Sequence, residues 1–175
     1  MTLLVLGIVI GFSIPMFTGV TNGSRLTANA NELVAAVQSA RSEAIRRNLR
    51  ASLCESDDGA TCSGTSPWNG WIVFADANGN GNADVGEIIR VGTIDAPMRV
   101  TPSPSIALAN NRITFRADGL AYDNAGALLQ ANIRVCMVTV NPQQNVRDVN
   151  LAVGGRVGVR PPINGAGACP APGDI

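Results

Sequence analysis

The sequence predicts an α+β fold in which one long N-terminal helix packs on antiparallel β-sheet. Three observations lead to this prediction. The chain opens with the apolar stretch "MTLLVLGIVIGFSIPMF" and carries no charged residue before Arg25. A helical repeat of apolar residues follows, and after Asn48 the pattern changes to short strands separated by turn residues. The 175 residues are enough for one globular domain with an appendage.

The apolar stretch over residues 2–20 is long enough to cross a bilayer, because about 20 helical residues reach roughly 30 Å. A cleaved signal peptide, a membrane anchor and an assembly stem are the alternatives. A signal peptide would begin with basic residues, whereas Met1 is followed by Thr2 and Leu3. We therefore expect residues 1–22 to be a membrane and assembly stem. Its apolar residues are Leu3, Leu4, Val5, Leu6, Ile8, Val9, Ile10, Phe12, Ile14, Pro15 and Phe17.

Residues 25–48 have the pattern of an amphipathic helix. Apolar residues recur at intervals of four, three, four, three and four, and charged or amide side chains occupy the other positions. The small residues of this seam would let the helix lie close to a sheet. The seam consists of Leu26, Ala30, Leu33, Val37, Ala40 and Ala44.

The remainder of the chain reads as β-structure with dense turn signals such as "DANGNGNADVG" and "VGGR". We expect a globular domain over residues 23–175, with the β-rich part over 50–160 and a coil tail over 161–175. The predicted strands are 50–54, 71–75, 87–92, 98–101, 106–109, 112–116, 132–140, 147–153 and 156–160.

Composition argues against an enzyme. The chain contains no His, which removes Ser-His-Asp and Cys-His nucleophile pairs, and no phosphate-binding loop is present. Its formal net charge is zero, and all 13 basic residues are Arg. No overall field therefore draws the protein toward nucleic acid or an acidic membrane surface.

Four cysteines stand in or beside loop-rich segments, without any Cys-x-x-Cys pair. This is typical of exported domains with disulfides, and free thiols in a cytosolic protein are the alternative. Of the three possible connectivities we favour Cys54–Cys62, a short local loop, with Cys136–Cys169, which would tie down the C-terminus.

The segment "DANGNGNADVGE" fits the pattern of a calcium-binding loop. Asp76, Asn78, Asn80, Asp84 and Glu87 occupy ligand positions, and Gly81 the turn. Strands rather than helices are predicted on both sides, so a long hairpin loop is the alternative. A calcium-dependent binding or adhesion module is a hypothesis that depends on this loop alone.

Several segments resemble the GspH/FimT family of pseudopilins and minor pilins. They are the stem ending in "IPMF", the helix "RLTANANELVAAVQSARSEAIRRN", "LCESDDGATC" with "WNGWIVFAD", and "RDVNLAVGGRVGVR". The resemblance covers nearly the whole chain. It implies a pilin-like fold, an inner-membrane stem with a periplasmic domain, and other pilins as partners. A minor pilin of a type IV pilus is the first interpretation, and a minor pseudopilin of type II secretion is the alternative.

Pilins are made with a short basic leader, a Gly before the cleavage site and an early Glu. None of these is present. We expect the start of the chain to be misassigned, and the alternative is a version that cannot be processed normally.

In FimT-like minor pilins a Gly-Arg-x-Arg motif is associated with binding duplex DNA, independently of its sequence, for natural transformation. Gly155 and Arg156 match this motif, Gly158 stands where the second Arg belongs, and Arg160 follows. Strand alternation puts residues 156, 158 and 160 on one face, with Arg134 and Arg147 expected on neighbouring strands. Such Arg residues could hold phosphates, and the alternative is ordinary solvated Arg.

Overall fold

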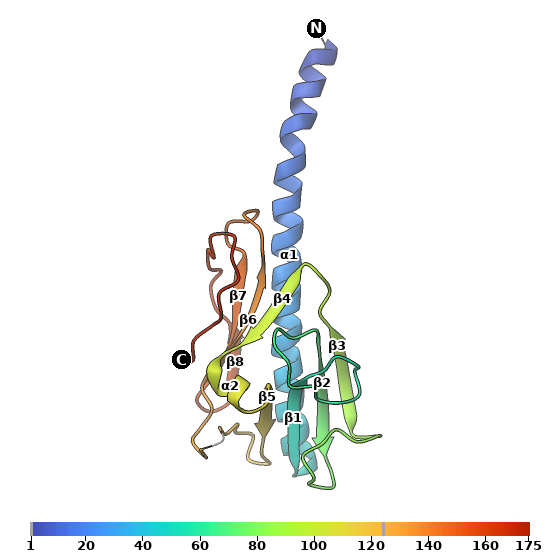
Figure 1. The fold of residues 1–175 in the computed structure, drawn as a ribbon, viewed down its shortest axis with the longest axis vertical. Helices are drawn as coiled ribbons and strands as arrows, with labels where there is room; N and C mark the ends of the chain where they lie inside the picture. The colour runs from blue at the N-terminus through green and yellow to red at the C-terminus, as the bar shows by residue number, and fades with distance from the viewer. Residues whose placement is uncertain (1, 124) are drawn as a thin grey trace.

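The computed structural model describes residues 2–123 and 125–175, with side chains from residue 18 onward. Helix α1 (Thr2–Arg47) is a single long helix. Figure 1 shows that its first half projects beyond the domain, whereas two sheets surround its second half. The predicted combination of a projecting stem and an α+β domain is confirmed.

The predicted seam of α1 is the face that the domain covers. Leu26, Ala30, Leu33, Val37, Ala40 and Ala44 are all buried, and Ala36 joins them. Four of these seven side chains are alanines, which lets the sheets approach the helix backbone closely. The helix ends at Arg47, where Asn48 adopts a left-handed backbone with φ of 55°.

The predicted stem residues Leu3, Leu4, Val5, Leu6, Ile8, Val9, Ile10, Phe12, Ile14, Pro15 and Phe17 lie outside the residues whose side chains are described. Among the residues whose side chains the structure describes, no helix is both long and apolar enough to cross a bilayer.

The first sheet has the strand order β3-β2-β1-β5, and all of its pairs are antiparallel. Its inner face packs on α1 through Leu53, Val73 and Ile113, together with Trp71. Its outer face carries a second, smaller cluster of Cys54, Ile72 and Phe74. Because both faces are covered, β2 is buried along its whole length. The strands are β1 (Arg50–Glu55), β2 (Gly70–Asp76), β3 (Ile88–Thr93) and β5 (Arg112–Phe115).

The second sheet has the order β4-β6-β7-β8 and is also antiparallel. Ile133 and Val135 on β6, and Val149 and Leu151 on β7, belong to the main core. The alternate residues of these strands point outward. The strands are β4 (Met98–Pro102), β6 (Ala131–Met137), β7 (Val146–Ala152) and β8 (Arg156–Val159).

One predicted strand is wrong: residues 106–109 belong to a short helix, α2 (Pro104–Leu108), and its C-cap. Ile106 is fully buried while Leu108 is 78% exposed, although a strand would point both to the same side. Pro104 stands in the first turn of the helix, where its missing N–H costs nothing.

Disulfides join Cys54 to Cys62 and Cys136 to Cys169, the connectivity that the sequence favoured. The C-terminal tail is coil, as expected, but it is held against the outer face of the second sheet. Arg134 and Asn132 donate hydrogen bonds to the carbonyls of Pro170 and Gly173, at 3.0 and 2.8 Å. Asp174 accepts a hydrogen bond from the Ser105 hydroxyl at 2.9 Å, so the tail reaches α2.

Candidate functional site

The predicted DNA-contact arginines lie on or beside the strands of the second sheet, and the strand register places them on different faces of it. Arg134 stands opposite Asp148, and Arg156 stands opposite Ala152. The backbone N–H of Arg160 donates to the carbonyl of Asp148 at 2.9 Å, which continues the same register. Arg134, Arg156 and Arg160 therefore share the outward face of the sheet, as predicted for Arg156 and Arg160.

Arg134 is not a free cation on this face. Its Nε and Nη2 donate to the two carboxylate oxygens of Asp148, each at 2.7 Å. Both side chains are largely buried, with exposed fractions of 14% and 5%. The hydrogen bond with Asp148 raises the pKa of Arg134, although burial opposes the shift. The pair is neutral overall and offers little attraction to a phosphate.

Arg147 lies on the opposite face, and its expected place beside the other arginines is wrong. It has the same parity as Val149 and Leu151, so it points toward α1. Its guanidinium donates to the carbonyls of Gln144 and Val146 at 2.8 and 2.9 Å. Burial lowers the pKa of Arg147. Its Nε donates to the hydroxyl of Thr27 on α1 at 3.4 Å, so this side chain joins the sheet to the helix.

Arg156 and Arg160 are the two predicted residues that remain exposed. They flank Gly158, which adds no side chain between them. With the Asn150 amide in the orientation that satisfies its neighbours, its oxygen accepts from Nε and Nη2 of Arg160 at 3.3 Å. A neutral partner leaves the charge of Arg160 intact.

Arg41 of α1 lies beside the Gly-Arg motif, and the sequence gave no indication of it. Its Nη1 donates to the carbonyl of Gly155 at 2.9 Å, and its Nε is buried without a hydrogen-bond partner among the described residues. Gly155 has φ of 71°, and a Cβ there would lie 2.9 Å from the carbonyl oxygen of Gly119. Glycine is therefore required for the turn to approach the helix. Arg41 and Arg156 both line a cavity of about 530 Å³ here, so two arginines border one cleft.

The predicted calcium loop is closed by its own hydrogen bonds. Asp76 accepts from the Gly81 amide at 3.0 Å, and Glu87 accepts from the Ala77 amide at 2.8 Å. The amides of Asn78 and Asn80 both donate to Asp84, each at 2.7 Å. Among the described residues, no group of three acidic, Cys or His side chains is placed to hold a metal ion. The second carboxylate oxygen of Asp76, Oδ1, is buried without a hydrogen-bond partner among the described residues. Calcium binding stays a prediction.

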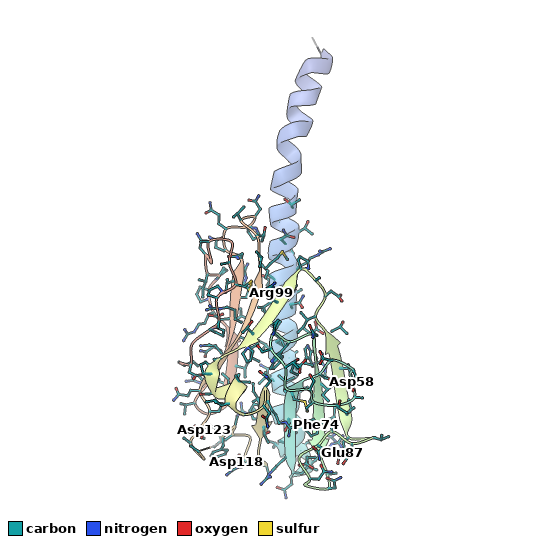
Figure 2. The ribbon with its side chains drawn as sticks, viewed as in Figure 1. Asp58, Phe74, Glu87, Arg99, Asp118 and Asp123 are labelled. Carbon is teal, nitrogen blue, oxygen red and sulfur yellow. A yellow bond between two sulfur atoms is a disulfide. The ribbon has the colours of Figure 1, made fainter. Side chains whose placement is uncertain are left out.

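Arg112 supplies a cation to the same loop from within the protein. Its Nη1 donates to the carbonyl of Gly81, and its guanidinium lies 5.5 Å from the centre of the Phe74 ring. Burial lowers the pKa of Arg112, and the charge of Asp76 opposes that shift. Figure 2 shows Phe74 and Glu87 in the half of the domain farthest from the stem. The loop is thus attached to the sheet by an arginine.

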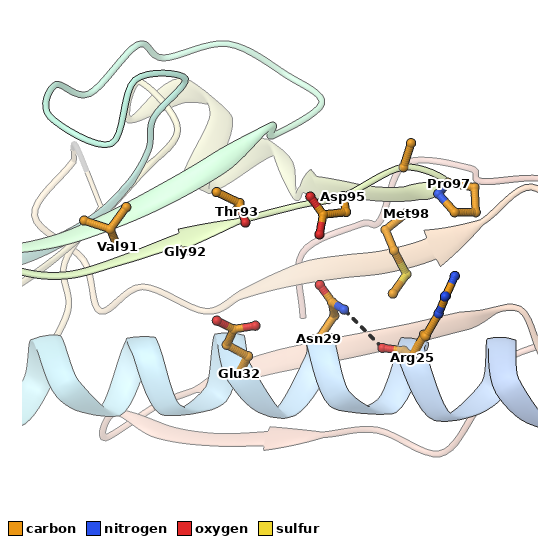
Figure 3. A pocket seen from close by; sticks show the side chains of 10 residues that line it. Arg25, Asn29, Glu32, Val91, Gly92, Thr93, Asp95, Pro97 and Met98 are labelled. Carbon is orange, nitrogen blue, oxygen red and sulfur yellow. Dashed lines mark hydrogen bonds between the residues drawn. The ribbon is translucent and has the colours of Figure 1, made fainter.

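A groove of about 530 Å³ runs between α1 and the segment that joins β3 to β4. Figure 3 shows Asn29 and Glu32 pointing from the helix toward Thr93 and Asp95. The hydrogen bond drawn there, from Asn29 to the carbonyl of Arg25 at 3.2 Å, lies within the helix. The lining mixes both signs of charge with apolar side chains, a composition that suits a protein surface better than a nucleic acid.

A helix that projects from a domain of two antiparallel sheets defines a pilin-like protein. The family model described as "Type II transport protein GspH" matches residues 29–155, and the chain belongs to this family. Its family and fold are those of structural pilins rather than enzymes, and the protein is a minor pilin or pseudopilin.

Two crystal forms of the Pseudomonas aeruginosa type IV minor pilin FimU have a similar fold. The P21 form has a TM-score of 0.55 and 22% identity, covering 81% of this chain and 92% of FimU. The P65 form has a TM-score of 0.52 and 19% identity, covering 77% and 92%. A comparison with curated proteins gives no significant match.

Proposed function

We propose that this protein is a minor pilin of a type IV pilus and that it joins the tip or priming complex of the filament. The observation that carries the proposal is the fold, which is similar to that of a type IV minor pilin along most of both chains. In this proposal residues 1–22 anchor the protein in the inner membrane, and residues 23–175 form the periplasmic domain. The uncharged sequence before Arg25 supports the anchor.

A minor pseudopilin of type II secretion is the second candidate, and the name of the matching family favours it. Both machines require contacts with other pilins. The groove between α1 and the segment joining β3 to β4 is a candidate surface for these contacts, because its mixed charges and apolar groups resemble those of a protein interface.

Deletion of the gene in its own host would separate the two machines. A pilus subunit should be recovered with sheared filaments, and its loss should reduce surface pili while protein secretion continues. Complementation with the full chain should restore piliation. Normal pili together with loss of secreted proteins would instead assign the protein to type II secretion.

Binding of duplex DNA during uptake for transformation is a further candidate function, supported by the arrangement of Arg41, Arg156 and Arg160. Arg41 and Arg156 line one cleft, and Arg160 is exposed directly after β8, the strand that begins with Arg156. Such a cluster would contact phosphates rather than bases, giving weak and salt-dependent binding without sequence preference.

A titration of the full chain in detergent with duplexes of unrelated sequence, at low and moderate salt, tests this function. The R156A/R160A variant should bind more weakly and depend less steeply on salt. R25A/R99A is the matched control, because it removes the same charge from residues outside the cleft, and it should bind like the unmodified protein. Equal weakening of DNA binding in both variants would show that binding depends on net charge and not on the cleft.

A further inference from the structure

The loop between β6 and β7, residues 138–145, exposes two valines at the stem end of the domain (Figure 1). Val138 and Val140 are 59% and 66% exposed, and Val20 on the neighbouring helix is 68% exposed. The loop sequence "VTVNPQQN" contains no charged residue. Figure 1 shows this loop reaching toward the projecting part of α1.

The loop is fixed to the helix where the stem leaves the domain. Asn22 donates a hydrogen bond to the carbonyl of Asn141 at 2.9 Å. A Cβ built on Gly23 would lie 3.8 Å from Cγ of Pro142, so the proline ring packs against this turn of the helix. Thr139 and Asn141 exchange two hydrogen bonds of 3.1 Å, which satisfy polar groups at the tip of the loop.

The point on α1 where the loop is attached determines how close the loop lies to a bilayer that surrounds the stem. The helix has no charge up to Arg25, and the residues between Val20 and Arg25 are Thr, Asn, Gly and Ser, without a large apolar side chain. The boundary between hydrocarbon and headgroups should therefore fall near Val20, about 3 Å along the axis from Asn22. This estimate depends on the residues at the domain end of the stem and not on where the stem begins.

We infer that the 138–145 loop rests on the lipid surface while the subunit waits in the membrane, with Val138 and Val140 entering the headgroup region. The inference rests on the proposed membrane anchor. A stem in a bilayer is surrounded by lipid. Apolar side chains beside the point where α1 leaves the bilayer are therefore the closest part of the domain to the lipid. The absence of charge from the loop favours that contact, because no charged group has to leave water, and the amides of Gln143 and Gln144 can hydrogen-bond in the headgroup region. The loop would thereby hold the domain at a fixed tilt above the membrane.

Quenching of tryptophan emission by brominated lipid tests the contact in the full chain. V140W and, as a second variant, V138W are reconstituted in phosphatidylcholine–phosphatidylglycerol vesicles with or without brominated acyl chains. The matched control is V85W, which replaces a fully exposed valine in the loop between β2 and β3. The native Trp68 and Trp71 are buried in the domain and supply a common background.

The expected result is a blue shift and loss of most of the added emission for V140W and V138W in brominated vesicles, with no loss for V85W. If the protein floats with the vesicles but the emission of both variants is not quenched, the loop contact is refuted while the membrane anchor stands. A blue shift that grows with protein density and is not quenched would overturn it in favour of a neighbouring subunit. Protein that fails to float with the vesicles would refute the membrane anchor as well.

Discussion

The Cys136–Cys169 disulfide should contribute more to stability than the Cys54–Cys62 disulfide, because it closes the longer loop. The two bonds span 33 and 8 residues of sequence. If a disulfide acts by restricting the unfolded chain, these loops correspond to about 3.7 and about 2.5 kcal/mol. Replacing Cys136 and Cys169 by Ala should therefore cost about 1.2 kcal/mol more than replacing Cys54 and Cys62.

Urea unfolding of the full chain in detergent measures both losses, followed by the emission of the buried Trp68 and Trp71. With a slope of about 2 kcal/mol per molar urea, the C136A/C169A variant should unfold about 2 M earlier than the unmodified protein. The other pair should lower the midpoint by a smaller amount. Equal midpoints, or the reverse order, would show that loop length does not determine the difference. The hydrogen bonds to Pro170 and Gly173 would then be sufficient to hold the tail.

Three further predictions concern charged groups of the domain. R134A should destabilise the protein by about 3 kcal/mol in urea unfolding, because it leaves the buried Asp148 carboxylate unpaired; the charge-free R134Q/D148N pair should recover part of this loss, and no recovery would contradict the reasoning. R112M should cost about 1–3 kcal/mol by removing the donor to Gly81, whereas calcium should leave the melting temperature of the unmodified protein unchanged. The hydrogen bond from the Thr61 amide, followed by that from Ala60, lowers the pKa of Asp58, so its contribution is complete above the ordinary carboxyl pKa and is lost as pH falls. D58N should accordingly flatten the decline in melting temperature between about pH 4 and pH 2; an unchanged decline would assign it to other carboxyl groups.

The sequence predicted those parts of the fold that depend on local periodicity. The seam from Leu26 to Ala44 follows from helical spacing alone, and the structure buries all six of its predicted residues. The predicted 106–109 strand failed because Ile106 and Leu108 are compatible with strand alternation when nothing else is known. The proline at the start of α2 was the available signal, since it suits the first turn of a helix.

The candidate site was less predictable because its geometry depends on contacts between distant residues. Arg41 and Gly155 are 114 residues apart in the chain, and no local pattern relates them. Arg147 appeared in the Arg-rich segment like its neighbours, yet its parity with Val149 turns it toward α1. The calcium-loop spacing was present in the sequence, but one carboxylate oxygen each of Asp76 and Glu87 accepts a hydrogen bond from the loop itself. Composition cannot distinguish these two uses of the same acceptors.

The proposed lipid contact and the proposed phosphate cleft lie at opposite ends of the half of α1 that the domain covers, and this separation constrains how both could operate. Asn22 fixes the 138–145 loop near the stem, whereas Arg41 holds Gly155 within the last two turns of the helix. A subunit buried within a filament would have neighbours along both regions. A subunit at the tip has no neighbouring subunit beyond the end of the domain that is farthest from the stem. Arg41 and Arg156 would therefore stay accessible in a tip subunit. If R156A/R160A loses DNA binding in isolation, the same variant should lower DNA capture by assembled pili only when the subunit occupies the tip.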